Sequence, residues 1–224
     1  LASIAYRNER YLEAAAEFRR LLEGGATTLG DGLDRASVER ELGVCLYRGG
    51  RYAEAAAAFQ NVVQFRSQDP LIYLFLGNAR ARNSELPAAV QAYRSALALE
   101  PGLAEARGNL ELVAVEMGYR LHDEERYAEA ADLVPADTEN TELLFLGAVC
   151  RYALKEYGVA REFLTRLNGI NDTFAEAHWN LALTCRALGD LAGAREALAR
   201  FRRLAPGDDR ADRLEAILAG SPAE

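Results

Sequence analysis

The segments ERYLEAAAEF (9–18), GRYAEAAAAF (50–59) and ERYAEAADLV (125–134) are three copies of one pattern. Weaker copies are SELPAAVQAY (84–93), KEYGVAREFL (155–164) and GDLAGAREAL (189–198). Their anchor residues are spaced by 41, 34, 41, 30 and 34 residues, with a mean of 36, and are Tyr11, Tyr52, Leu86, Tyr127, Tyr157 and Leu191. A repeat of this length indicates supersecondary units that stack on one another.

Each unit contains two amphipathic helices. In the copy at 50–59, Tyr52, Ala55, Ala56 and Phe59 recur at i, i+3, i+4 and i+7, which places them on one face of a helix. The segment ahead of the next copy, YLFLGNARAR (73–82), has the same period. No stretch alternates with a period of two for long enough to predict a strand. The sequence therefore predicts an all-α chain of helical hairpins.

Polar residues and prolines mark the ends of these helices. Asp69 followed by Pro70 is an N-cap acceptor ahead of the residue tolerated at the first helical position. Thr173 and Glu176 form a capping-box pattern in the last unit. The segment 24–36 is rich in glycine and predicts a flexible loop.

The two-helix unit resembles the tetratricopeptide repeat, whose signature is W-x2-LG-x2-Y…A-x3-F…P. The third unit carries the pattern as Tyr73-x2-Leu76-Gly77-x2-Arg80…Ala89-x3-Tyr93…Pro101. The sixth carries it as His178-x2-Leu181-Ala182-x2-Cys185…Ala194-x3-Leu198…Pro206. The resemblance implies an α-solenoid, a right-handed superhelix of helix-turn-helix repeats. The small residues Gly77 and Ala89 would let the two helices approach, with Tyr93 filling the space beside them.

The resemblance covers nearly the whole chain, and we expect one solenoid domain over 1–224. The fourth unit is irregular, because an insertion predicts a long first helix and Pro135 shortens the second. Since the sequence starts at Leu1 within a helical pattern, we expect a fragment of a longer chain. The repeats are expected at about 1–24, 36–69, 70–103, 104–136, 138–170 and 173–206, with a capping helix at 208–219 and a frayed SPAE tail.

Composition excludes several classes of function. The 224 residues carry a net charge of −8, with a pI of about 5.0, which argues against nucleic acid as a partner. No apolar run is long enough for membrane insertion, and no signal peptide is visible. Of the 26 basic residues 25 are arginine, a bias that suggests a GC-rich bacterial genome. The compartment stays undetermined: the cytoplasm is favoured, and the periplasm is the alternative.

No residue pattern predicts catalysis, a metal or a cofactor. The cysteines Cys45, Cys150 and Cys185 lie in apolar helical patterns and are expected to be buried thiols. His178 occupies a core-facing position, and His122 in the HDEE segment is expected in a solvated turn. The chain is therefore expected not to be an enzyme.

The first helices are more apolar than one packing stripe requires, and two interpretations follow. Either a groove lined by these helices binds a peptide, as the resemblance implies, or each helix packs against neighbours on both sides. The predicted groove residues are Leu74, Phe75, Asn78, Val115, Tyr119, Leu144, Phe145, Arg151, Trp179, Asn180, Leu183 and Arg186. Members of the family that bind a C-terminal carboxylate need several Lys, Arg and Asn side chains on successive inner helices. The predicted groove does not carry that set of residues.

The favoured function is a non-catalytic scaffold that binds a peptide or helix of a partner protein through apolar anchors. One alternative is a self-associating structural repeat, in which the chain forms a homo-oligomer. The other is a regulatory arm of an enzyme whose catalytic domain lies outside this sequence.

Overall fold

The structure, a computed structural model, describes residues 2–24, 28–29 and 33–220. The chain, treated above as one domain, divides into two compact units. These are an N-terminal unit, Leu1–Val113, and a C-terminal unit, Ala114–Glu224, and the boundary falls within helix α6. The predicted frayed tail, 221–224, lies outside the described residues.

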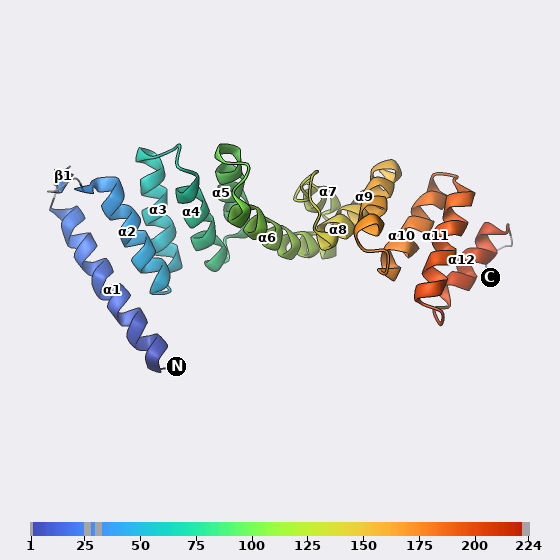
Figure 1. Cartoon of the computed structure of the whole chain (residues 1–224), viewed down its shortest axis with the longest axis horizontal. Helices are drawn as coiled ribbons and strands as arrows, with labels where there is room; N and C mark the ends of the chain where they lie inside the picture. Colours follow the sequence, from blue (N-terminus) through green and yellow to red (C-terminus); the bar gives the residue numbers. More distant parts are fainter. Residues whose placement is uncertain (1, 25–27, 30–32, 221–224) are drawn as a thin grey trace. The chain divides into compact units, whose positions relative to one another are not determined.

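The described residues are almost entirely helical, which confirms the predicted all-α solenoid class (Figure 1). The first part of the chain forms α1 (Ala2–Glu23), α2 (Arg35–Arg48), α3 (Tyr52–Phe65), α4 (Pro70–Arg82), α5 (Leu86–Leu99) and α6 (Ala104–Asp123). The second part forms α7 (Tyr127–Ala131), α8 (Thr141–Ala153), α9 (Tyr157–Ile170), α10 (Ala175–Ala187), α11 (Leu191–Leu204) and α12 (Arg210–Leu218).

Helices that follow one another in the chain pack side by side within each unit. In the N-terminal unit α2 packs on α3, α3 on α4 and α4 on α5, and Figure 1 shows these helices in a row. In the C-terminal unit the same order holds from α7 to α12. The alanines Ala55, Ala89, Ala160 and Ala194 are all fully buried between helices, as the small-residue pattern predicts.

The turns that precede α3, α5, α7, α9 and α11 use the same backbone motif. The residue two positions before the second helix has a positive φ, and these residues are Gly50, Ser84, Glu125, Lys155 and Gly189. The next N–H donates to a carbonyl five residues back, as in Arg51 to Leu46 at 2.8 Å and Glu85 to Arg80 at 2.9 Å. This is the Schellman arrangement that closes a helix. It fixes the turn length and therefore the register between the two helices.

Side chains cap several helix starts, with one correction to the sequence analysis. Asp69 accepts a hydrogen bond from the Leu71 N–H at 3.0 Å, as predicted, and Pro70 is the first residue of α4. The capping box predicted at Thr173 is wrong, because Phe174 is the N-cap residue of α10 and has no side-chain cap. The Thr173 hydroxyl instead donates to Asn171 Oδ1 at 2.8 Å.

The segment predicted as a loop at 24–36 contains two very short strands. β1 (Thr28–Leu29) pairs antiparallel with β2 (Leu33–Asp34), and Thr28 lies opposite Asp34. Asp34 then caps α2 by accepting from the Ser37 N–H at 2.7 Å and from Arg66 at 2.7 Å. These bonds hold the pKa of Asp34 at about 2. The strands are too short for alternation to reveal them in the sequence.

The C-terminal unit ends on α12, which Arg210 fastens to α10 and α11. Its apolar residues Ala211, Leu214 and Leu218 are buried. The Arg210 guanidinium donates to Glu176 Oε1 at 2.6 Å and lies 5.0 Å from the Trp179 ring centroid. Trp179 itself packs against Phe201, with ring centroids 5.3 Å apart. Arg210 therefore joins three helices through charge and ring contacts.

Arg210→Ala is expected to loosen α12 while leaving the rest of the unit folded. The Arg210 side chain is 38% exposed, so water screens its ion pairs and we expect a loss of about 1 kcal/mol. Amide hydrogen exchange in α12 would measure this as faster exchange of the Leu214 and Leu218 N–H groups. Arg213→Ala is the matched control, since Arg213 lies on the same helix and its guanidinium pairs with the neighbouring N-cap residue Asp209 at 2.6 Å. Equal effects of the two variants would contradict the anchoring role.

Candidate peptide-binding surface

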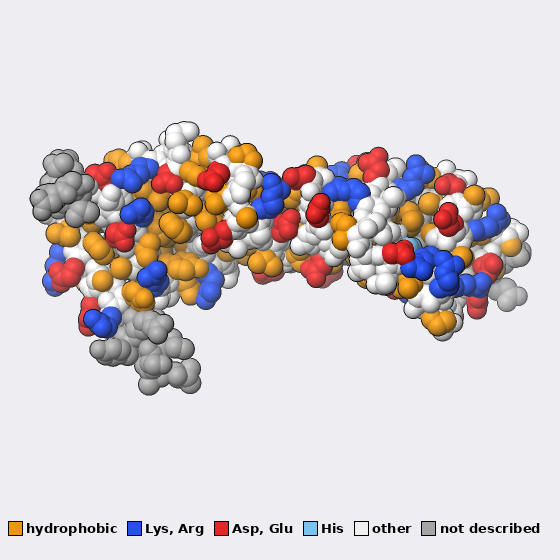
Figure 2. Space-filling model, in the orientation of Figure 1, with side chains coloured by type: hydrophobic (Ala, Val, Ile, Leu, Met, Phe, Trp, Pro, Cys, Tyr) orange, Lys and Arg blue, Asp and Glu red, His pale blue; other side chains and the backbone are white. Residues whose placement is uncertain are grey.

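Two adjoining pockets lie along the first helices of the N-terminal unit. One, of about 220 Å³, and the other, of about 420 Å³, share the side chains of Tyr47 and Asn78. Hydrophobic side chains also gather over α2–α4 on the face that Figure 2 shows. We call the two pockets together the N-terminal groove, and its residues are Val44, Tyr47, Arg48, Phe59, Phe75, Asn78, Ala81, Arg82, Tyr93, Glu105, Asn109, Leu112 and Val113.

The smaller pocket is aromatic. The rings of Phe59 and Phe75 lie with centroids 5.6 Å apart, and Tyr47 lines the same cavity. Phe59 is buried, whereas Phe75 and Tyr47 are half-buried. Burial raises the pKa of the Tyr47 hydroxyl, which therefore stays protonated near neutral pH. A cavity of this size and lining suits one apolar side chain.

Asn78 lies where the two pockets meet, and its amide is held in one orientation. Its Oδ1 accepts from the Tyr93 hydroxyl at 2.9 Å and from Asn109 Nδ2 at 2.8 Å. The Asn78 Nδ2 group has no partner among the described residues. An amide with its oxygen occupied on one side presents its two N–H donors on the other. Asn78 is therefore equipped to donate to a peptide carbonyl.

Two arginines line the groove, and each contacts a tyrosine side chain. The Arg82 guanidinium donates to the Tyr52 hydroxyl at 2.8 Å and lies 5.0 Å from that ring centroid. Arg48 lies over the Tyr11 ring at 5.6 Å. Leu112 is 70% exposed at the other end of the groove. The surface thus combines an aromatic pocket, amide donors, cations and an exposed leucine.

The C-terminal unit has a smaller pocket on its first helices. It has a volume of about 200 Å³ and is lined by Tyr119, Phe145 and Phe174 with Thr141, Glu142 and Asn171. The Phe145 and Phe174 rings pack with centroids 5.0 Å apart. This pocket resembles the aromatic part of the N-terminal groove. It also holds an oriented amide, because Asn171 Oδ1 accepts from the Thr173 N–H at 3.1 Å and from the Thr173 hydroxyl at 2.8 Å.

Two predicted groove residues are instead part of the core, which corrects the sequence analysis. Leu74 is 1% exposed and Leu144 is 0% exposed, so neither can contact a partner. Their neighbours Phe75 and Phe145 line the pockets. Because consecutive helical residues are 100° apart, one residue of each Leu-Phe pair faces the core and the other the pocket.

The other predicted groove residues divide between pockets and internal contacts. Asn78 and Tyr119 line pockets, whereas Arg151 pairs with Glu156 at 2.7 Å and Asn180 donates to the Glu176 carbonyl at 2.8 Å. The remaining four line none of the pockets described above: Val115 and Leu183 are half-buried, Trp179 lies under Arg210, and Arg186 is exposed.

Sequence reasoning missed Tyr47, Arg48, Arg82 and Asn109. A signal for some of them was available, since Arg82 lies four residues after Asn78 and Arg48 stands at the equivalent place in the preceding repeat. Asn109 gave no such signal, because it lies in the irregular fourth unit. Its contact with Asn78 depends on how α6 packs.

Neither a metal-binding cluster nor a membrane-spanning helix is found among the described residues. Among them, no three His, Cys, Asp or Glu side chains cluster closely enough to hold a metal ion. No described helix combines the length and apolarity needed to cross a membrane. Cys150 and Cys185 are buried, and burial raises the pKa of both thiols, to about 11 for Cys150.

Comparison with known proteins finds a repeat-family model that matches two segments of the chain, and solved structures that share its fold. The sequence model of the tetratricopeptide repeat matches residues 1–70 and 171–209. The solved structure of MamA AMB-1 is 20% identical with a TM-score of 0.50, covering 78% of this chain and 93% of MamA. YrrB, described as a TPR protein with an unusual peptide-binding site, is 16% identical with a TM-score of 0.50, covering 90% and 98%.

No curated protein matches the sequence. The likeness to the solved structures concerns the fold alone, whereas the family match rests on the sequence itself. The sequence match identifies tetratricopeptide repeats in residues 1–70 and 171–209, and the helical hairpins of both units have the two-helix form of such repeats.

Proposed function

We propose that this protein is a non-catalytic interaction module whose N-terminal groove binds an extended segment of a partner protein. The observation that carries the proposal is Asn78, whose amide oxygen is occupied by Tyr93 and Asn109 while its nitrogen is left to donate. A backbone carbonyl of an extended peptide is a suitable acceptor. The donor sits between an aromatic pocket and a wider polar one.

The chemistry of the groove defines the partner. An aromatic or leucine side chain of the peptide would enter the pocket of Tyr47, Phe59 and Phe75, where apolar burial supplies most of the affinity. A carboxylate near this anchor would be attracted by Arg48 or Arg82. Glu105 at the wider pocket disfavours a second acidic group there.

The test uses peptides that are selected from a random displayed library for binding to the whole chain. Asn78→Asp keeps the oxygen that accepts from Tyr93 and Asn109 but removes the amide donors, so it tests donation without dismantling the network. We expect Asn78→Asp to weaken peptide binding about tenfold, and Phe75→Ser by at least that much. Fluorescence polarisation of labelled peptides would measure both.

The matched control is Phe65→Ser. Phe65 is 58% exposed on α3 and lies outside the groove, so its loss removes a similar apolar area elsewhere on the unit. Peptide affinity should be unchanged in this variant. The proposal would be refuted if Phe65→Ser weakened binding as much as Phe75→Ser, or if no library peptide depended on Asn78.

A further inference from the structure

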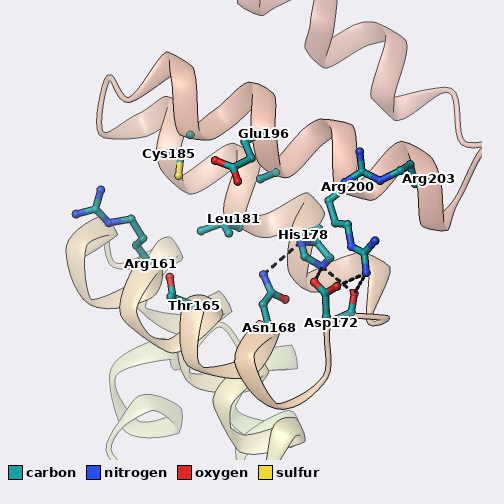
Figure 3. A pocket seen from close by; sticks show the side chains of 12 residues that line it. Arg161, Thr165, Asn168, Asp172, His178, Leu181, Cys185, Glu196, Arg200 and Arg203 are labelled. Atoms are coloured by element: carbon teal, nitrogen blue, oxygen red, sulfur yellow. Dashed lines mark hydrogen bonds and ion pairs between the residues drawn. The ribbon is translucent and has the colours of Figure 1, made fainter.

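A second pocket, of about 470 Å³, lies in the C-terminal unit between α9 and α11, with α10 at its base (Figure 3). Leu181 and Ala197 contribute apolar surface, and Arg161, Arg200 and Arg203 contribute guanidinium groups. Figure 2 shows Lys and Arg side chains gathered over this end of the unit. The pocket is formed by different helices from those of the N-terminal groove and is independent of the peptide-binding proposal.

Asp172 is neutralised within this pocket. Its carboxylate pairs with the Arg200 guanidinium and lies 3.1 Å from His178 Nε2. On the other side of the imidazole, Asn168 Nδ2 donates to His178 Nδ1 at 3.3 Å. Nε2 therefore carries the proton and donates to the Asp172 carbonyl at 3.0 Å. These contacts hold the side chains of one wall of the pocket in place. The negative charge of Asp172 is compensated by Arg200.

Cationic charge remains after this pairing. Arg203 is exposed and has no ion pair or hydrogen bond with the described residues, and the acid nearest to Arg161 is Asp190 at 3.8 Å. The Arg200 Nε group is buried without a hydrogen-bond partner. Glu196 is the carboxylate that opposes this charge, and it too has no partner among the described residues. The side chains that line the pocket thus include three arginines against two carboxylates, a net charge of +1, in a chain whose net charge is −8.

The repeat itself does not require these charges. The same positions in the N-terminal unit lie 105 residues earlier, as Ala55 and Ala89 do from Ala160 and Ala194. There the residues are neutral: the equivalents of Arg161, Glu196, Arg200 and Arg203 are Ala56, Gln91, Ser95 and Ala98. The helices pack in both units, so the arginines are an addition to the fold.

We propose that this pocket binds a small organic anion through a phosphoryl or carboxylate group. Arg200 and Arg203 are three residues apart on α11, and guanidinium groups match the geometry of both oxyanions. The carbon skeleton of the ligand would lie on Leu181 and Ala197. The volume falls within the range of about 300–1,000 Å³ that small-molecule sites have.

The test titrates the whole chain, labelled with ¹⁵N, with phosphoglycolate, succinate and inorganic phosphate in separate experiments. Saturable shifts of the Gly193 and Ala197 amide signals are expected with at least one of the two organic anions. Tighter binding of phosphoglycolate would assign a phosphoryl ligand, and tighter binding of succinate a carboxylate ligand. Arg203→Gln should weaken binding about tenfold, because a charge-assisted hydrogen bond is lost.

Two further variants are expected to change the anion affinity in the opposite direction or not at all. Glu196→Gln should tighten anion binding by about threefold, since it removes a repelling charge. Arg186→Gln removes a cation from the exposed surface of α10 outside the pocket and should leave the affinity unchanged. The proposal is overturned if neither organic anion gives saturable shifts, if Arg186→Gln weakens binding as much as Arg203→Gln, or if Glu196→Gln weakens it.

Discussion

Leu144→Asp is expected to unfold the C-terminal unit. Leu144 is fully buried in a cluster with Leu164, Leu167 and Ala177. The substitution removes apolar contacts and places a carboxylate within a cluster of buried apolar side chains. Losing a buried leucine alone costs roughly 3 kcal/mol, and the desolvated carboxyl adds to this. Urea unfolding followed by circular dichroism would show a lower midpoint, or no helical transition for this unit.

Phe145→Asp is the control for that result. Phe145 is the next residue on α8, is half-buried and lines the pocket with Tyr119, so an aspartate there reaches water. We expect a cost of about 1–2 kcal/mol from the lost ring contact with Phe174. If Leu144→Asp were as mild as Phe145→Asp, the assignment of Leu144 to the core would be wrong. The sequence interpretation of Leu144 as a partner contact would then stand.

The periodicity of the sequence was sufficient to predict the helices but not the faces of the first helices. In Tyr73-Leu74-Phe75-Leu76 every residue is apolar, so no polar residue marks the solvent side. The helix α4 packs against both α3 and α5, and its apolar surface is shared between them. Leu74 therefore belongs to the core and Phe75 lines a pocket, while peptide binding at that pocket stays a prediction.

The polar parts of both sites depend on contacts between distant residues. Asn78 and Asn109 are 31 residues apart, and their hydrogen bond exists only because α4 and α6 bring the two amides together. Arg200 similarly meets Asp172, 28 residues earlier, across the α9–α11 pocket. In the sequence Arg200 appeared only as part of a basic run, whose commonest explanation is a solvated helix face. Side-chain pairing of this kind follows from packing, which periodicity does not describe.

Gly77→Leu is expected to destabilise the N-terminal unit, and the structure gives the reason. A Cβ atom on Gly77 would lie 2.5 Å from Cε1 of Tyr93, which is itself buried and hydrogen-bonded to Asn78. The ring cannot move away without breaking that bond and disturbing the groove. Overpacking of this kind costs about 1–3 kcal/mol, and the larger leucine side chain places the cost at the upper end. Thermal and urea unfolding of the whole chain would measure the loss.

Gly108→Ala separates this packing effect from the general effect of removing a glycine. Gly108 lies within α6, and a Cβ atom there would meet nothing within 4 Å. Alanine should therefore raise stability by about 0.5–1 kcal/mol, through helix propensity alone. Gly77→Ala, with a single added methyl, should still destabilise, because the clash arises at Cβ. If Gly77→Ala stabilised the unit as Gly108→Ala does, α4 and α5 would not be in the close contact that holds Tyr93 against Asn78, and the oriented amide of the groove would lose its support.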